Sequence, residues 1–120
     1  DRRAEVVPAK QAQSQGAKQA VLRYRLLEAQ NGVCSLLDIH IDTGRFHQIR
    51  VQLSHAGLPI LGDMKYGTEK SDQVSRELSV SSVALCACEL AFLHPASGEK
   101  LCFRTVPRGA VFERFRVELK

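Results

Sequence analysis

The stretch from residue 43 to residue 68 gathers most of the side chains that could bind or transform a ligand. A short predicted helix in it carries two arginines, two histidines and two glutamines, namely Arg45, His47, Gln48, Arg50, Gln52 and His55. A loop rich in glycine and proline follows the helix and adds Asp63, Lys65 and Tyr66. Positive charge and hydrogen-bonding groups on a rigid element beside a shaped loop suit a polyanionic ligand that carries bases.

The spacing of apolar residues predicts that this helix runs from about Gly44 to Ala56. Thr43 is expected to cap its N-terminus, Gly57 to follow its last turn, and Pro59 to prevent its continuation. Four residues at helical spacing are expected to face the core, namely Phe46, Ile49, Leu53 and Ala56. The opposite side would then display Arg45, Gln48, Gln52 and His55, with His47 and Arg50 toward its flanks.

A β-hairpin is expected before the helix. Residues 19–29 and 33–41 have the character of strands, and Asn31-Gly32 between them is a pair that type I′ turns favour. Apolar and polar residues alternate cleanly only in the second half of the second strand. This alternation indicates a sheet with one buried face and one open face.

The sequence after the loop predicts further strands and a closing helix. Residues 69–79 fit either a short helix around Gln73–Leu78 or a mobile loop. Residues 82–93 are small or apolar on both faces, which is typical of a central strand covered on both sides. After a turn at 94–98, a strand is expected at 100–106 and a helix around Val111–Phe115. The element order predicts an α+β fold, a mixed and mostly antiparallel sheet with helices packed on it.

Length and composition allow one globular core. The chain has 120 residues, 44% hydrophobic and 25% charged, with a formal net charge of +4 and a pI of about 9.1. The modest basic excess is compatible with a nucleic-acid partner. No apolar run reaches the roughly 20 residues of a membrane helix, and no signal peptide is recognisable, so we expect a cytoplasmic protein without a membrane partner. Because the first residue is Asp, we expect the chain to be either processed or part of a longer protein, and we favour the second.

The four cysteines, Cys34, Cys86, Cys88 and Cys102, all lie in predicted strands and form no C-x-x-C pair. We expect reduced, half-buried thiols, with Cys86 and Cys88 on the same face of one strand. The four histidines are scattered, so no metal site is expected.

Residues 43–67 resemble the third core motif of the RluA-type pseudouridine synthases, roughly TGR-x-HQIR-x-x-L-x-x-x-G-x-PI-x-GD-x-x-YG. The matching residues are Thr43, Gly44, Arg45, His47, Gln48, Ile49, Arg50, Leu53, Gly57, Pro59, Ile60, Gly62, Asp63, Tyr66 and Gly67. The hairpin before this stretch and the residues Leu90–Pro95 and Gly98-Glu99 after it agree with the family pattern, so the resemblance covers about residues 18–115. One small departure is Cys86, which precedes Ala87 where the family often has histidine.

The larger departure is the absence of two upstream motifs. Family members carry an Arg-Leu-Asp motif with the catalytic aspartate and a second motif with an active-site tyrosine, and neither is found here. Asp38, Asp42 and Tyr24 lie in the predicted hairpin, which is a different context. The resemblance therefore implies that residues 19–120 are the C-terminal half of a catalytic domain. Residues 1–18 show little periodicity and are expected to be either a flexible lead-in or an incomplete element whose partner lies upstream. The resemblance also implies that this chain alone is inactive and that the N-terminal half of the domain is its partner.

The resemblance implies an isomerase that converts uridine to pseudouridine in rRNA or tRNA without a cofactor. The reaction needs a carboxylate at the ribose, a pocket that excludes water, and a base taken out of its stack. By resemblance, Arg50 pairs with the catalytic aspartate outside this chain, since an opposite charge keeps a buried carboxylate ionised. Periodicity alone would favour an arginine that only solvates a helix face. Asp63 is expected to fix its own loop through side-chain to backbone bonds.

The remaining candidates are expected at the RNA interface. Arg45 and His47 lie in the first turn of the predicted helix, where free N–H groups and the helix dipole attract phosphate, although His47 equally fits a capping or packing role. Gln48 either reads a base edge or braces the neighbouring loop. Lys65 is expected to contact a phosphate, against the alternative of an exposed lysine with no specific partner. Tyr66 is either a packing residue or a stacking platform.

Two other functions remain open at this point. A stand-alone RNA-binding module without catalysis would use the same basic residues and would bind RNA in a salt-dependent way. A structural or protein-interaction domain has only the ordinary composition in its favour.

Overall fold

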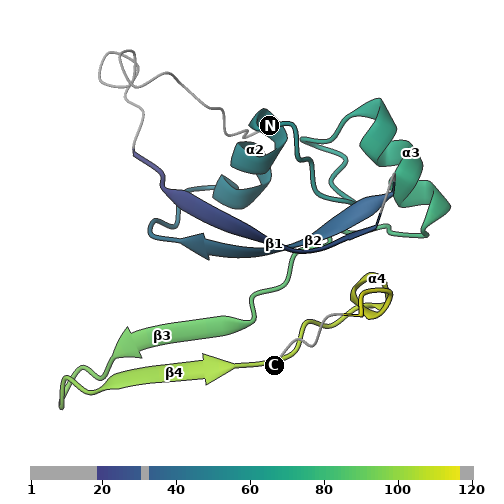
Figure 1. Cartoon of the computed structure of the whole chain (residues 1–120). Helices are drawn as coiled ribbons and strands as arrows, with labels where there is room; N and C mark the ends of the chain where they lie inside the picture. Colours follow the sequence, from purple (N-terminus) through teal and green to yellow (C-terminus); the bar gives the residue numbers. More distant parts are fainter. Residues whose placement is uncertain (1–18, 31–32, 117–120) are drawn as a thin grey trace, which may run out of the picture.

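The computed structural model describes residues 19–30 and 33–116. The expected lead-in at 1–18 and the Asn31-Gly32 turn lie outside these residues. The element order is β1 (Leu22–Gln30), β2 (Cys34–Ile41), α2 (Gln48–His55), α3 (Glu69–Glu77), β3 (Glu89–Leu93), β4 (Lys100–Arg104) and α4 (Ala110–Glu113). In Figure 1, α2 lies on one side of the β1–β2 hairpin and the β3–β4 hairpin on the other.

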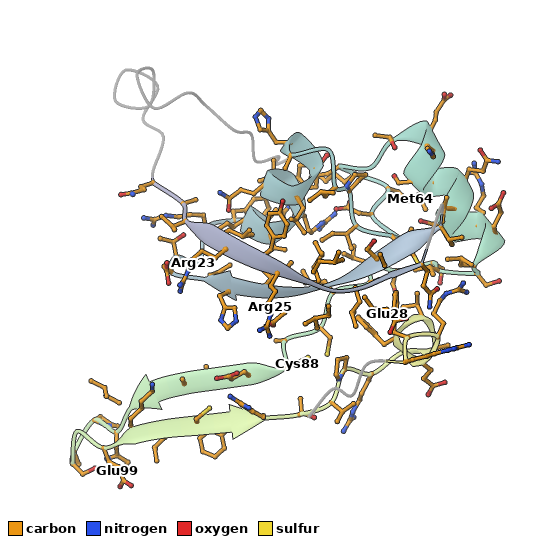
Figure 2. The ribbon with its side chains drawn as sticks, in the orientation of Figure 1. Arg23, Arg25, Glu28, Met64, Cys88 and Glu99 are labelled. Atoms are coloured by element: carbon orange, nitrogen blue, oxygen red, sulfur yellow. The ribbon has the colours of Figure 1, made fainter. Side chains whose placement is uncertain are left out.

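The α+β class is confirmed, but the single sheet is not. The strands form two separate antiparallel two-stranded sheets, β1–β2 and β3–β4, in the part of the chain that the structure describes. The β1–β2 hairpin confirms the first predicted pair of strands, and a register shift between Leu26 and Glu28 marks a bulge in β1. The charged residues of the hairpin share one surface, where Arg23 faces His40 and Arg25 faces Asp38 across the strands. Figure 2 shows Arg25 on the side of the hairpin away from α2.

The prediction of a central strand over residues 82–93 is wrong in length and in position. Only Glu89–Leu93 form a strand, and this strand pairs with β4 alone. Residues 82–88 run past the loop after α2 instead, where Ala84 N donates to Leu61 O. Cys86 and Cys88 therefore precede β3, while Cys34 and Cys102 do lie in strands. The expected strand at 100–106 is likewise shorter, and Leu90, Leu93 and Phe103 of this hairpin are exposed rather than covered.

The helix α2 begins later than predicted, at Gln48 instead of Gly44. Its N-cap position is taken by His47 in a left-handed conformation, so the expected Thr43 cap is wrong. Its end is as predicted, because Gly57 has φ +82° and the bonds Gly57 N to Ser54 O and Leu58 N to Leu53 O form a Schellman motif.

The later start changes which side of α2 is covered. Leu53 is buried as predicted and Ile49 is half-buried, but Phe46 and Ala56 are exposed. Gln48, expected on the outer side, is buried. Phe46 lies outside the helix, so the predicted helical stripe does not extend to it, and the turn before α2 directs Gln48 inward.

The ambiguous segment 69–79 contains the helix α3 over Glu69–Glu77, longer than the short helix at Gln73–Leu78 that the sequence allowed. Its start is fixed by a capping box, because Thr68 accepts from Ser71 N while Ser71 Oγ accepts from Thr68 N. Serine at the third helical position replaces the usual Glu or Gln of this box, which is why the sequence signal was missed.

The apolar core of the described residues is small. Leu36, Leu53 and Tyr66 are its buried members, contributed by β2, by α2 and by the loop after α2. Buried polar residues, Gln48, Asp63, Ser71 and Ser75, accompany them. All of these buried residues except Leu36 belong to the segment 48–75, which is the segment that carries the candidate site. The closing helix α4 is confirmed as one short turn-like helix, joined to the end of β1 by Arg114 Nε donating to Gln30 Oε1 at 2.9 Å.

Candidate active site

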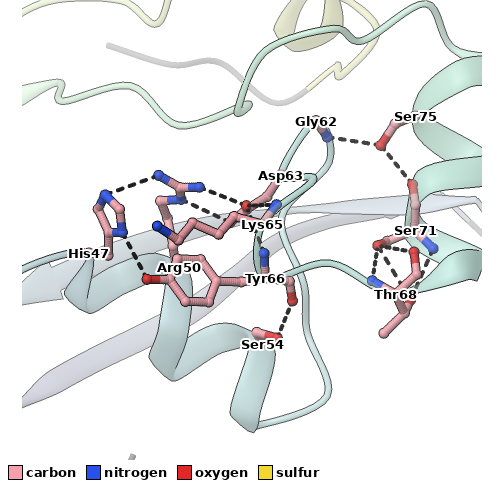
Figure 3. Close-up of polar contacts among 10 residues, drawn as sticks. All are labelled: His47, Arg50, Ser54, Gly62, Asp63, Lys65, Tyr66, Thr68, Ser71 and Ser75. Carbon is pink, nitrogen blue, oxygen red and sulfur yellow. Dashed lines mark hydrogen bonds and ion pairs between the residues drawn. The ribbon is translucent and has the colours of Figure 1, made fainter. Parts of the chain in front are cut away.

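The centre of the site is a two-point ion pair between α2 and the loop that follows it. Arg50 Nε donates to Asp63 Oδ2 at 3.0 Å, and Arg50 Nη2 donates to Asp63 Oδ1 at 2.8 Å (Figure 3). The Asp63 side chain is 1% exposed and the Arg50 side chain 22% exposed. The carboxylate is thus buried, while the guanidinium reaches the surface. A side-on arginine–carboxylate pair of this kind fixes the plane of the guanidinium.

Asp63 also organises its own loop, as the sequence predicted. Its Oδ1 accepts from the backbone N–H groups of Lys65 and Tyr66, each at 3.1 Å. Gly62 precedes it with φ +81°, and a Cβ at that position would lie 2.0 Å from Ser82 O. Only glycine fits there, and the close approach of the segment at Ser82 keeps the loop folded toward α2.

Burial alone would raise the pKa of the Asp63 carboxyl. The hydrogen bonds from Arg50 and from the backbone N–H groups of Tyr66 and Lys65, with the positive charge of Arg50, outweigh burial and hold this pKa below its ordinary value. The hydrogen bond to Asp63 in turn raises the pKa of Arg50. Both groups are therefore charged at neutral pH, and the guanidinium half of this neutral pair is the part that reaches the surface.

His47 and Tyr66 form the wall of the site next to Arg50. His47 Nδ1 lies 2.8 Å from Tyr66 Oη, and Arg50 Nη1 lies 3.4 Å from His47 Nε2 (Figure 3). The Arg50 guanidinium carbon lies 5.1 Å from the centre of the Tyr66 ring. Tyr66 is 4% exposed and its backbone carbonyl accepts from Ser54 Oγ on α2. These are the contacts of a packed residue that supports Arg50 rather than those of an open stacking platform.

Gln48 has the contacts of a bracing residue. Its Oε1 accepts from Thr43 Oγ1 at 2.8 Å and from Arg45 N at 3.0 Å, and its Nε2 donates to Val21 O at 3.0 Å. The side chain is 4% exposed, so it ties the start of α2 to the beginning of β1. Thr43, expected as a helix cap, takes part in this brace and also accepts from Val21 N.

Arg45 precedes α2, and Lys65 lies in the loop after it, two residues beyond Asp63. Arg45 is exposed and its Nε donates to Gln19 O at 2.8 Å. Lys65 is half-buried, with its Nζ 6.0 Å from the centre of the Tyr66 ring. Lys65 thus shares with Arg50 a position near the Tyr66 ring. On the hairpin, Arg23 and Arg25 each lie within 3.4 Å of an aspartate, Asp42 and Asp38 respectively.

What sequence reasoning missed is the partner of Arg50 within this chain. The sequence placed Asp63 in the right loop but assigned it only to the backbone bonds, because nothing in the spacing shows that the Schellman turn at Gly57 brings this loop back along α2.

The described residues hold no group of three or more His, Cys, Asp or Glu side chains that could bind a metal ion. None of the helices that the structure describes is long and apolar enough to cross a membrane.

Comparison with known proteins agrees with the motif. The family model for RNA pseudouridylate synthase matches residues 1–55. An uncharacterized RNA pseudouridine synthase of Chloroflexus aurantiacus is 47% identical over 75 residues, which are 62% of this chain and 22% of that protein. Ribosomal large subunit pseudouridine synthase D of Zymomonas mobilis is 38% identical over 88 residues, 72% of this chain and 27% of that protein.

A third relative extends the match over most of the chain. An uncharacterized RNA pseudouridine synthase of Synechocystis is 38% identical over 105 residues, 88% of this chain and 30% of that protein. The chain thus spans less than a third of the length of these relatives. On the matched residues and the motif at 43–67, the chain belongs to the RluA-type RNA pseudouridine synthase family and represents part of its domain.

Proposed function

We propose that the intact protein isomerises uridine to pseudouridine in rRNA or tRNA, with Arg50 as the fixed cation of its active site. In this proposal a catalytic aspartate outside this chain binds the guanidinium, and the chain by itself is inactive. The single observation that carries the proposal is the geometry of Arg50, which is held in one orientation by Asp63 yet remains 22% exposed.

The pair with Asp63 leaves Arg50 able to bind a second acid. A guanidinium has five N–H donors, and the bonds to Asp63 and the contact with His47 use three of them. Two donors remain without a partner among the described residues, one on each terminal nitrogen. An aspartate that approached these two nitrogens would find a preorganised cation, which keeps a carboxylate ionised next to the ribose.

RNA binding in this proposal rests on Arg45 and Lys65. Arg45 is exposed and Lys65 is half-buried, and each is proposed to contact a phosphate. Gln48 and Tyr66 act in this proposal as supports of the site, and His47 as a neighbour of Arg50. The name of the Zymomonas mobilis relative refers to the ribosomal large subunit, which makes rRNA the first substrate to test.

The test is the formation of pseudouridine by the intact protein. Transcripts of large-subunit rRNA and of tRNA are incubated with the enzyme, and their nucleosides are separated after digestion. We expect pseudouridine to appear at a stoichiometric level with the intact protein and to be absent with residues 1–120 alone. Salt-dependent RNA binding by the intact protein without any pseudouridine would contradict the proposal and favour the RNA-binding module.

A further inference from the structure

We propose that His47 is a positioning residue for Arg50 and that it acts as a neutral imidazole with its proton on Nδ1. Arginine is a donor only, so the Nε2 atom that lies 3.4 Å from Arg50 Nη1 has to offer a lone pair. The other ring nitrogen, Nδ1, lies 2.8 Å from Tyr66 Oη and is then the donor. The two contacts together select one tautomer, the less common one of free histidine.

The surroundings of His47 fix the ring in this place. Its backbone is left-handed, with φ 51°, and its ring stacks on Phe46 at a centroid distance of 3.9 Å. The ring meets the edge of Tyr66 at a centroid distance of 5.5 Å, and Tyr66 is itself buried. The backbone conformation, Phe46 and Tyr66 thus fix the His47 ring, and the fixed ring can in turn orient Arg50 Nη1. Asp63 accepts hydrogen bonds from the opposite edge of the guanidinium, through Nε and Nη2.

Protonation of His47 would reverse this contact. A second proton turns Nε2 into a donor and puts a cation next to the Arg50 guanidinium. Lys65, near the Tyr66 ring, adds positive charge, and the negative charge of Asp63 is already bound to Arg50. Acid is therefore expected to push Arg50 away from His47. This consequence rests on the proposed function, since it is read out through the role of Arg50 in catalysis.

The proton position is tested directly, without an activity assay. Nitrogen NMR of the intact protein labelled in its histidine rings reports which nitrogen carries the proton. We expect His47 to show the Nδ1-protonated neutral form at pH 8, and the exposed His55 of the same helix provides a reference ring signal. In the Tyr66→Phe variant the preference for Nδ1 should weaken. A ring protonated on Nε2, or on both nitrogens, at pH 8 would overturn the proposal.

Two matched variants test the positioning role. Glutamine and methionine are both unbranched and carry a similar backbone cost at a left-handed position, but only glutamine offers a strong acceptor, since a thioether sulfur accepts weakly. We expect His47→Met to lower kcat about tenfold or more at unchanged KM, because a bond to a charged group is lost. His47→Gln should restore kcat to within about threefold, and it should lack the fall in kcat in mild acid that we expect of the wild type.

Equal kcat values in the glutamine and methionine variants, with the same acid limb as the wild type, would show that His47 does not position Arg50. If the intact protein forms no pseudouridine, the proposed function fails on its own test, while the NMR result still decides where the proton of His47 lies.

Discussion

Arg50 and Asp63 lie 13 residues apart in the chain and share two hydrogen bonds, at 3.0 and 2.8 Å. One residue comes from α2 and the other from the loop that returns along it. The same carboxylate accepts two backbone N–H groups of its own loop. One buried side chain thus orders the loop and orients the cation, so a single substitution is expected to disturb both.

Replacing Asp63 with asparagine should destabilise the protein strongly. The change leaves the partly buried Arg50 charge without its partner, and removing one member of a buried pair costs on the order of 3 kcal/mol. Asp42→Asn is the matched control, since Asp42 is 53% exposed and its pair with Arg23 is worth less than about 1 kcal/mol. Urea unfolding of the two variants measures the difference. Equal losses in both would mean that the Arg50–Asp63 pair contributes no more than a surface pair.

The same pair predicts how stability depends on pH. The pKa of Asp63 is lower in the folded protein than in the unfolded chain, so its contribution is fully present above the ordinary carboxyl pKa of about 4. It is lost as pH falls below 4 and through the folded-state pKa. The gap in unfolding free energy between wild type and Asp63→Asn should stay constant from pH 5 to 7 and shrink below about pH 4. A gap that widens in acid would show that the sign of the pKa shift is wrong.

The loop at Gly62 predicts a contrast between two glycines with the same backbone conformation. Gly57 has φ +82° with no atom within 4 Å of a built Cβ, whereas at Gly62, with φ +81°, the Cβ would lie 2.0 Å from Ser82 O. Gly57→Ala should cost only the left-handed strain, about 1–2 kcal/mol. Gly62→Ala should cost clearly more, because the backbone at Ser82 has to move. Thermal unfolding of both variants checks this, and a Gly62→Ala protein as stable as Gly57→Ala would contradict the close packing of the two segments.

The sequence predicted the parts of the fold that depend on local signals. The hairpin β1–β2 follows from two strand-like runs, and the end of α2 follows from Gly57 and Pro59. The motif at 43–67 contains the residues that the structure brings together around Arg50, namely His47, Asp63 and Tyr66.

Other features depend on contacts that one sequence does not show. The start of α2 was misplaced because the left-handed His47 and the Gln48 brace to Val21 O replace the expected Thr43 cap. The length of the strand at 82–93 was overestimated because apolar residues on both faces fit a covered strand. Residues 82–88 instead run past the loop after α2, where Ala84 N donates to Leu61 O. The partner of Arg50 was missed because it depends on the path of the returning loop.

The most direct test of the central claim is the single-turnover rate of pseudouridine formation by the intact Arg50→Lys protein. Lysine keeps the charge but cannot bond Asp63 side-on and still offer donors to a second acid. Arg76→Lys is the matched control, since Arg76 is exposed on α3. We predict a rate at least about 100-fold below wild type for Arg50→Lys, with RNA affinity retained and Arg76→Lys unchanged. A rate for Arg50→Lys equal to that of wild type and Arg76→Lys would contradict the assignment of Arg50 as the active-site cation.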